Sequence, residues 1–315
     1  MKVLMLDSAH PRLKAGLEEM GFRVSEDYRH TADQLRDLDT YGGLIIRSRL
    51  AVNRKLLQSM PQLRFIGRVG AGLENIDLDY CIKRGIQVLN APEGNRNAVG
   101  EQALAMLLML FNNLGRADRE VRAGHWRRAE NRGYELAGKT VGIIGYGNTG
   151  AALARRLRGF DCRILAYDKY KKAYADPWTE ECDLQTLQAE AEVISLHVPQ
   201  SEETFHLVDE DFIAAVKHDF YLINTARGKS VDTRALVDAM QSGKIKGACL
   251  DVLEYEKSSF ENLFAQPLPA ELNYLLKSEK TVLSPHIAGW THESHHRMAE
   301  ALLEKIASLN LNHGA

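Results

Sequence analysis

The chain has 315 residues, which is too long for one ordinary domain and fits two domains of average size. Its formal net charge is -2 with 26% charged residues, so no basic field would attract nucleic acid or an anionic membrane surface. Its four cysteines lack any paired spacing, which argues against a disulfide scaffold or a zinc site and favours reduced thiols in a cytoplasmic protein.

The first part of the chain alternates short apolar runs with amphipathic stretches. This pattern is typical of a parallel sheet covered by helices on both faces. Asp7 follows the opening apolar run too closely for a signal peptide, so the run is interpreted as a strand. The predicted strands are "KVLMLD", "FRVSE", "GLIIRS", "LRFIGRVG" and "IQVLNA".

A long apolar helix is predicted from Asn97 to Gly115, continued by "REVRAGHW". Its most apolar run, at 103–111, is far too short to span a membrane. The run predicts a dimerisation arm, with a helix buried inside the chain as the alternative. A second set of strands follows it: "TVGIIGYG", "CRILAYD", "EVISLHVP", "FYLINTAR", "IKGACLDV" and "TVLSPH".

The order of elements predicts two α/β domains with parallel sheets, of Rossmann or flavodoxin-like type. The last segment has helical spacing, and the simplest completion returns it to cover the first domain. We therefore expect a discontinuous first domain, 1–96 plus 290–315. A second domain of Rossmann type, 97–289, is inserted into it and includes the helical arm.

The stretch "GIIGYGNTG" carries the G-x-G-x-x-G pattern as Gly145, Gly147 and Gly150, between a strand and a helix. Such glycines permit a tight turn, close approach of a pyrophosphate, and packing of helix on strand. Asp168 ends the next strand, where a carboxylate can bond a ribose hydroxyl and repel a 2'-phosphate. We expect NAD rather than NADP, although Lys169 and its neighbours Lys171 and Lys172 weaken that preference. A structural turn is the alternative.

Three strand ends of the second domain carry ionisable groups: Arg227, Glu256 and His286. The carboxyl ends of parallel strands meet at the edge that also holds the nucleotide, so these groups are expected to converge there. A histidine can accept the proton that leaves a hydroxyl group during hydride transfer, and a carboxylate bonded to it would fix its tautomer. An arginine fork suits the carboxylate of a 2-hydroxy acid. Singly, each residue has an ordinary structural explanation.

Over essentially its full length, the chain resembles the D-isomer-specific 2-hydroxyacid dehydrogenase family. The resemblance rests on segments in the family's order: "VGAGLENIDL", "GKTVGIIGYGNTG", "YDKY", "HVPQSEETFHLV", "LINTARGKSVD", "GACLDVLEYE" and "LSPHIAG". It implies the catalytic set Arg227, Glu256 and His286. It implies cofactor contacts from Gly147, Asn148, Thr149, Asp168, His197, Pro199, Thr204, Thr225, Ala226, Asp251 and Gly289.

For the substrate, the resemblance implies Arg47, Ser48, Ala71, Gly72 and Arg227, with the backbone N–H groups of the "VGAG" loop as an anion nest. A surface role is the alternative for Arg47. The family often has proline after the catalytic glutamate, whereas Lys257 stands here and opens an insertion-like segment at 257–280 that we expect over the site or a subunit interface. Glu254 therefore competes with Glu256 as the acidic partner.

Within the family the chain most resembles phosphoglycerate dehydrogenases, with glyoxylate and hydroxypyruvate reductases as rivals. Arg127, Arg128 and Arg132 would serve a phosphorylated substrate if the helical arm reaches a partner subunit, and are otherwise solvent-facing. No C-terminal regulatory domain is expected after the closing helix. The predicted partners are a small 2-hydroxy or 2-oxo acid and a second copy of the chain, with no metal, nucleic acid or membrane. An NAD-sensing corepressor is the non-enzymatic alternative.

Overall fold

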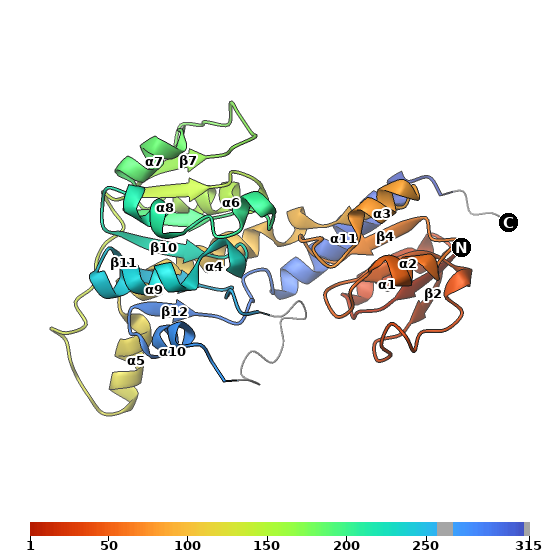
Figure 1. The fold of residues 1–315 in the computed structure, drawn as a ribbon, viewed down its shortest axis with the longest axis horizontal. Helices are drawn as coiled ribbons and strands as arrows, with labels where there is room; N and C mark the ends of the chain where they lie inside the picture. The colour runs from red at the N-terminus through yellow and green to blue at the C-terminus, as the bar shows by residue number, and fades with distance from the viewer. Residues whose placement is uncertain (257–266, 312–315) are drawn as a thin grey trace. The chain divides into compact units, whose positions relative to one another are not determined.

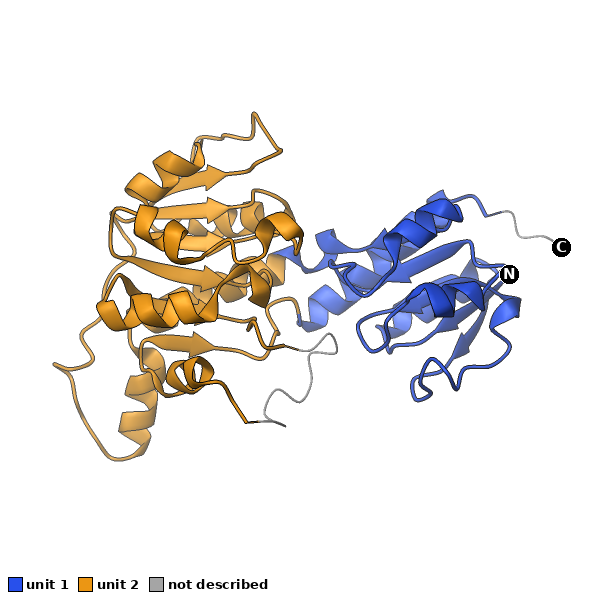
Figure 2. Cartoon of the chain, in the orientation of Figure 1, with its two compact units in different colours: residues 1–96, 257–261, 290–315 blue, residues 97–256, 262–289 orange. Residues whose placement is uncertain are grey.

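The structure is a computed structural model, and it describes residues 1–256 and 267–311. It divides into two compact units (Figure 2). Among the described residues, unit 1 contains 1–96 and 290–311, and unit 2 contains 97–256 and 267–289. Of the insertion-like segment at 257–280, residues 257–266 lie outside the described residues. Its later part forms the helix α10 (Ala270–Lys277).

Unit 1 is built on a five-stranded parallel sheet in the order β2-β1-β3-β4-β5, a flavodoxin-like order. Its strands are β1 (Lys2–Met5), β2 (Arg23–Glu26), β3 (Tyr41–Ile46), β4 (Phe65–Arg68) and β5 (Gln87–Asn90). Both faces are buried, because alternate residues of one strand enter different cores: Val3 and Met5 one, Leu4 and Leu6 the other.

Two pairs of helices cover the sheet of unit 1 (Figure 1). The helices α1 (Pro11–Glu19) and α11 (His292–Ser308) pack on the face of Val3, and α11 contributes the buried Leu302 and Ile306. The helices α2 (Arg54–Gln58) and α3 (Leu78–Lys83) pack on the other face. The last helix of the chain is therefore part of the core formed by the first strands.

Unit 2 contains a seven-stranded parallel sheet in the order β12-β11-β10-β9-β6-β7-β8. Its strands are β6 (Thr140–Ile144), β7 (Arg163–Tyr167), β8 (Thr179–Glu181), β9 (Val193–Leu196), β10 (Phe220–Asn224), β11 (Ile245–Leu250) and β12 (Thr281–Leu283). The chain leaves β6 toward β7 and later returns on its other side as β9, so the order reverses between β6 and β9. Doubly wound sheets bind ligands outside the carboxyl ends of strands at such a point.

Helices cover both faces of this sheet as well. The helices α4 (Pro92–Phe111) and α6 (Asn148–Leu157) share one core with β6. The helices α7 (Leu184–Glu190), α8 (Glu210–Ala215), α9 (Thr233–Ser242) and α10 pack on the opposite face. These two parallel-sheet units confirm the predicted α/β class.

The apolar run at 103–111 lies in α4 and packs within unit 2, where Leu107 and Phe111 are buried. This side of the helix is thus buried within the chain, as the alternative expected, whereas Met109 is 37% exposed, so the dimerisation arm stays a prediction. The helix also ends earlier than expected, because Asn113 adopts a left-handed φ of 50° before α5 (Leu114–Arg122) begins. Val121 and Trp126, further along, are exposed.

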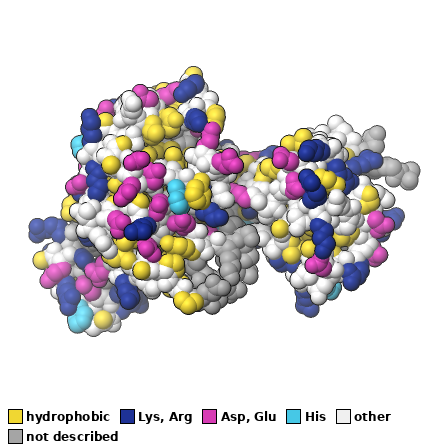
Figure 3. All heavy atoms as spheres, viewed as in Figure 1, with side chains coloured by type: hydrophobic (Ala, Val, Ile, Leu, Met, Phe, Trp, Pro, Cys, Tyr) yellow, Lys and Arg dark blue, Asp and Glu magenta, His cyan; other side chains and the backbone are white. Residues whose placement is uncertain are grey.

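No helix in residues 1–256 and 267–311 combines the length and apolar character needed to cross a membrane. On the face shown in Figure 3, acidic and basic side chains are interspersed, as the small net charge leads one to expect.

Candidate active site

The glycine loop follows β6 directly, at the point where the strand order reverses. Gly145 has a φ of +93°, and a Cβ there would lie 2.6 Å from the carbonyl oxygen of His197. A Cβ on Gly150 would overlap the carbonyl of Gly145, so helix and turn pack against each other. Apart from its chain neighbours, a Cβ on Gly147 would meet no atom of the described residues within 4 Å. The three glycines thus have the three different roles that the nucleotide-binding pattern requires.

The helix α6 begins at Asn148, with Gly147 at the N-cap and without a side-chain cap. Its first turn therefore keeps N–H groups available for an anion. Thr149, in the same turn, lies 3.1 Å from Nδ1 of His197, whose Nε2 lies 2.9 Å from the Ser195 hydroxyl. Burial lowers the pKa of His197 to about 3, so the ring is neutral. In this structure His197 links the end of β9 to the phosphate-facing helix.

Asp168 follows β7 at the same edge of the sheet, and its carboxylate organises the glycine loop. One oxygen accepts the backbone N–H of Tyr146 at 2.8 Å, and the other accepts those of Tyr170 and Lys171. Burial alone would raise the pKa of Asp168, but these hydrogen bonds lower it, so the carboxylate is charged. Lys169 is ion-paired with Glu203 at 2.9 Å, which reduces its pull on a phosphate.

The remaining cofactor candidates of unit 2 follow β9 and β10. Thr204 donates its hydroxyl to the Pro199 carbonyl at 2.6 Å and so closes the loop after β9. Ala226 is buried, and the buried hydroxyl of Thr225 has no hydrogen-bond partner in the described chain. A buried polar group of this kind normally finds a partner. The unused hydroxyl, the open space at Gly147 and the uncapped helix fit a dinucleotide along this edge.

Arg227 lies in a turn after β10 that Asn224 fixes from both ends. The Asn224 side chain accepts the N–H of Ala226 at 3.0 Å and donates to the carbonyl of Arg227 at 2.9 Å. A Cβ on Gly228 would overlap the Leu253 carbonyl, so this turn packs tightly against the loop after β11. Asn224 was not among the predicted site residues, although its place in "INTARG" at a strand end was a usable signal.

His286 and Glu256 are hydrogen-bonded, with Nδ1 of the histidine 2.8 Å from a carboxylate oxygen. The side chains are 23% and 17% exposed, so both remain within reach of a small ligand. Because a carboxylate only accepts hydrogen bonds, the proton of this bond lies on Nδ1, which fixes the tautomer of the ring. Glu254, the competing candidate, instead has a carboxylate oxygen 2.8 Å from Nε2 of His206. Its other oxygen accepts the backbone N–H and the hydroxyl of Thr233, the first residue of α9.

Asp251 holds the loop that carries His286. Its buried carboxylate accepts the Ser284 hydroxyl at 2.6 Å and the N–H groups of Ile287 and Ala288, each at 2.9 Å. Its carbonyl accepts the N–H of His286 at 2.8 Å. The resemblance presented Asp251 as a cofactor contact, and the structure adds this positioning role. Gly289 ends the loop and is the last residue of unit 2.

The substrate candidates of unit 1 lie after β3 and β4, which are neighbouring strands. Asn75 donates to the carbonyls of Arg47 and Leu50, at 3.1 and 3.0 Å. Asn90 donates to the Ala71 carbonyl at 2.6 Å. These two asparagines, which the sequence reasoning missed, hold Arg47 and Ser48 on one loop and Ala71 and Gly72 on the next.

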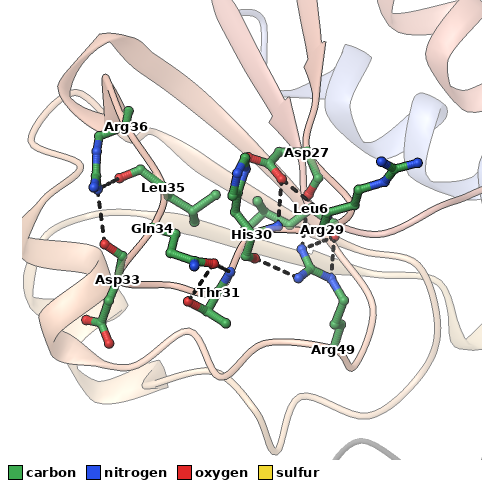
Figure 4. Close-up of polar contacts among 10 residues, drawn as sticks. All are labelled: Leu6, Asp27, Arg29, His30, Thr31, Asp33, Gln34, Leu35, Arg36 and Arg49. Carbon is green, nitrogen blue, oxygen red and sulfur yellow. Dashed lines mark hydrogen bonds and ion pairs between the residues drawn. The ribbon is translucent and has the colours of Figure 1, made fainter.

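Arg49 fixes the loop after β3 from the other side (Figure 4). Its guanidinium donates to the carbonyls of Leu6, Asp27 and His30, with distances from 2.6 to 3.0 Å. Because Leu6 and Asp27 directly follow β1 and β2, Arg49 joins the carboxyl ends of three strands. The predicted site residues thus form one group in each unit. The described residues contain no cluster of three metal-ligating side chains.

The match to known proteins covers almost the whole chain. D-3-phosphoglycerate dehydrogenase of Archaeoglobus fulgidus is 33% identical over 98% of this chain, which spans only 57% of that relative. Hydroxypyruvate reductase of Thermotoga maritima is 34% identical over 96% of this chain and 94% of its own length. Glyoxylate reductase of Thermococcus litoralis is 37% identical over 87% and 81%.

The fold agrees with that of solved structures. D-lactate dehydrogenase of Aquifex aeolicus, solved as a complex with NAD and lactic acid, superimposes with a TM-score of 0.83 and 29% identity, covering 98% of this chain and 95% of that one. The family model for the NAD binding domain of D-isomer specific 2-hydroxyacid dehydrogenases matches residues 104–288. NAD is thereby confirmed as the cofactor. The chain belongs to the D-isomer specific 2-hydroxyacid dehydrogenase family.

Proposed function

We propose that the protein interconverts a D-2-hydroxy acid and its 2-oxo acid with NAD, in the manner of a 3-phosphoglycerate dehydrogenase. The observation that carries the proposal is the hydrogen bond of 2.8 Å between His286 and Glu256. It lies in the unit that also carries Arg227 and the glycine loop. A histidine held by a carboxylate is suited to exchange a proton with a hydroxyl group.

In this mechanism the residues of the chain bind, orient and move a proton. Bound NAD supplies the acceptor or donor of the hydride at the carbon that carries the hydroxyl group. Arg227 binds the carboxylate of the acid and polarises the adjacent carbonyl during reduction. His286 takes the hydroxyl proton on Nε2 during oxidation and returns it during reduction, while Glu256 keeps the ring oriented. Gly145, Gly147, Gly150 and Asp168 hold the cofactor.

The remaining predicted contacts complete the proposed site. The cofactor is contacted or supported by residues of unit 2, namely Asn148, Thr149, His197, Pro199, Thr204, Thr225, Ala226, Asp251 and Gly289. Arg47, Ser48, Ala71 and Gly72 bind the acid together with Arg227. The surface alternative for Arg47 is not favoured, because its side chain is only partly exposed and stacks on Trp290.

Two substrate classes remain in competition. Similarity to the archaeal phosphoglycerate dehydrogenase supports a phosphorylated acid. The hydroxypyruvate and glyoxylate reductases match larger shares of their own lengths and support an unphosphorylated one. Within one chain three arginines face solvent: Arg127, Arg128 and Arg132. The guanidinium of Arg127 also lies 3.5 Å from the carboxylate of Glu120. A role for them requires a second subunit.

We also propose a homodimer and a cytoplasmic location. Exposed apolar side chains on and after α5, namely Leu114, Val121, Trp126 and Tyr134, support the dimer. The four cysteines are all free thiols, which suits a reducing compartment. Sedimentation at several protein concentrations tests the dimer, and a persistent monomer would rule it out.

The first test of function is NADH oxidation with 3-phosphohydroxypyruvate, hydroxypyruvate, glyoxylate, pyruvate and longer 2-oxo acids. A strong preference for the phosphorylated acid supports the proposal, and activity on the others alone identifies a reductase. Silence with every acid favours the NAD-sensing alternative. His286→Ala should lower turnover about 10²- to 10⁴-fold. Near-normal turnover with an unchanged pH profile would show that another group moves the proton.

A further inference from the structure

Arg47 lies at the carboxyl end of β3, and its guanidinium forms no ion pair with a carboxylate among the described residues. The carboxylate of Asp7 accepts the backbone N–H of Arg47 at 2.6 Å and lies 3.7 Å from the guanidinium of Arg49. Burial lowers the pKa of Arg47, although Asp7 opposes this, and a guanidinium stays charged in proteins. In the described part of the chain, no carboxylate forms an ion pair with the Arg47 side chain. A partly buried cation of this kind is expected to bind an anion from outside.

Trp290 supplies the surface on which Arg47 rests. The Cζ atom of Arg47 lies 3.8 Å from the centre of the Trp290 ring, a close cation–π contact. Stacking occupies the flat face of the guanidinium and leaves the N–H groups at its edge for an anion. Trp290 is 53% exposed, so packing in a hydrophobic core does not explain why a tryptophan stands at this position.

The start of α11 fixes the Trp290 ring. Thr291 is the N-cap and forms a reciprocal capping box with Ser294. Trp290 and His295 therefore occupy the positions before the cap and four after it, which often pack together to set how a chain enters a helix. Their rings meet edge to face at 4.5 Å.

His295 adds no competing charge at this place. Burial first, and then Arg47, His10 and His292, lower the pKa of His295, which keeps its ring neutral. Its Nε2 atom is buried and has no hydrogen-bond partner within residues 1–256 and 267–311. Arg47, Trp290 and His295 thus form a cluster in unit 1. Its cation is Arg47, and its polar atom without a hydrogen-bond partner among the described residues is Nε2 of His295.

Resting on the proposed function, we propose that Trp290 is a positioning residue that holds Arg47 for a second anionic group of the substrate, beyond the carboxylate bound by Arg227. Trp290 then sets the preference for acids with such a group, a phosphate in the favoured case. The energy of a cation–π contact sets the size of the effect: losing the ring should weaken binding of such acids about 2- to 30-fold.

The kinetic test compares Trp290→Ala, Trp290→Phe and wild type with 3-phosphohydroxypyruvate and with glyoxylate, which lacks a second anionic group. Trp290→Ala should raise KM for the phosphorylated acid about 2- to 30-fold with kcat nearly unchanged, and Trp290→Phe should recover part of the loss. KM for glyoxylate should change less than 2-fold. Equal losses with both acids, or a loss only in kcat, would overturn the inference.

Trp178 provides a matched control. It also lies under an arginine, with Cζ of Arg158 4.3 Å from its ring centre. Arg158 is already ion-paired with Asp176, and Trp178 lies beside the edge strand β8 of unit 2. Trp178→Ala should leave both KM values unchanged. A rise in KM like that of Trp290→Ala would mean that loss of any such pair perturbs the enzyme.

A fluorescence measurement separates this inference from the proposed function. The chain has three tryptophans, so Trp126→Phe with Trp178→Phe leaves Trp290 as the only tryptophan, whose emission is excited selectively over that of the tyrosines. Adding 3-phosphoglycerate should change its emission saturably, lactate should not, and a further Arg47→Met should abolish the change. Absence of a saturable change overturns the inference even if the enzyme is active. A change in a protein inactive with every acid keeps the inference and refutes the proposed function.

Discussion

Replacing His197 by Asn should flatten the dependence of folding stability on pH. His197 is 8% exposed, and burial lowers its pKa from 6.5 to about 3. Between these two values the unfolded chain binds a proton at this ring and the folded chain does not. Acid therefore favours unfolding. The free energy of unfolding keeps its full value above the pKa that His197 has in the unfolded chain. It then falls by about 1.4 kcal/mol per pH unit as the pH drops toward the pKa of His197 in the folded chain.

Integrated from pH 7 to pH 5, this loss amounts to about 2 kcal/mol in the wild type and is absent from His197→Asn. Urea unfolding followed by circular dichroism at pH 5, 6, 7 and 8 measures it, because the cost of the lost hydrogen bonds is constant over this range. The gap between the two proteins should narrow by about 2 kcal/mol toward pH 5. His218→Asn, at an exposed position, is the control. A gap independent of pH would show that the folded protein protonates His197.

The other predictions concern packing. Gly150→Ala should lower the melting temperature and NAD affinity together, because its Cβ would overlap the Gly145 carbonyl. Gly147→Ala should shift the melting temperature by no more than about 2 °C while calorimetry shows weaker NAD binding; equal effects of the two alanines would refute their distinct roles. Leu302→Ala, in the core of unit 1, should cost about 2 to 5 kcal/mol in urea unfolding, and a cost below about 1 kcal/mol would mean that α11 packs loosely.

The strands of both sheets could be predicted because they are short apolar runs, of which those inside the sheets, such as β3 and β10, are buried on two faces. The exception is β8, whose three residues "TEE" carry no apolar signal and pair only along one edge of β7. For a related reason, the long helix was predicted to end at Gly115, whereas α4 ends at Phe111. Its apolar pattern runs past Phe111, while the left-handed Asn113 that ends it depends on local backbone geometry.

The candidate site divides in the same way. The glycines and the ionisable strand ends could be found from the sequence, because the chemistry requires those residue types after strands. The supporting contacts could not. Asn75 and Asn90 act through backbone carbonyls of other loops, and His197 joins a strand end to a helix that begins 49 residues earlier, at Asn148. Such contacts depend on which strands become neighbours.

The loop of His286 shows how the fold fixes an ionisable side chain after a strand. His286 has a left-handed φ of 55°, a conformation that costs about 1 to 3 kcal/mol in a residue with a side chain. Asp251 offsets that cost by accepting N–H groups from three consecutive residues, of which Ile287 lies 36 positions away in sequence. Glu256 fixes the ring from the loop after the same strand. Both the backbone and the ring of His286 are thus held by β11 and the loop after it, so the protein positions this group before any substrate binds.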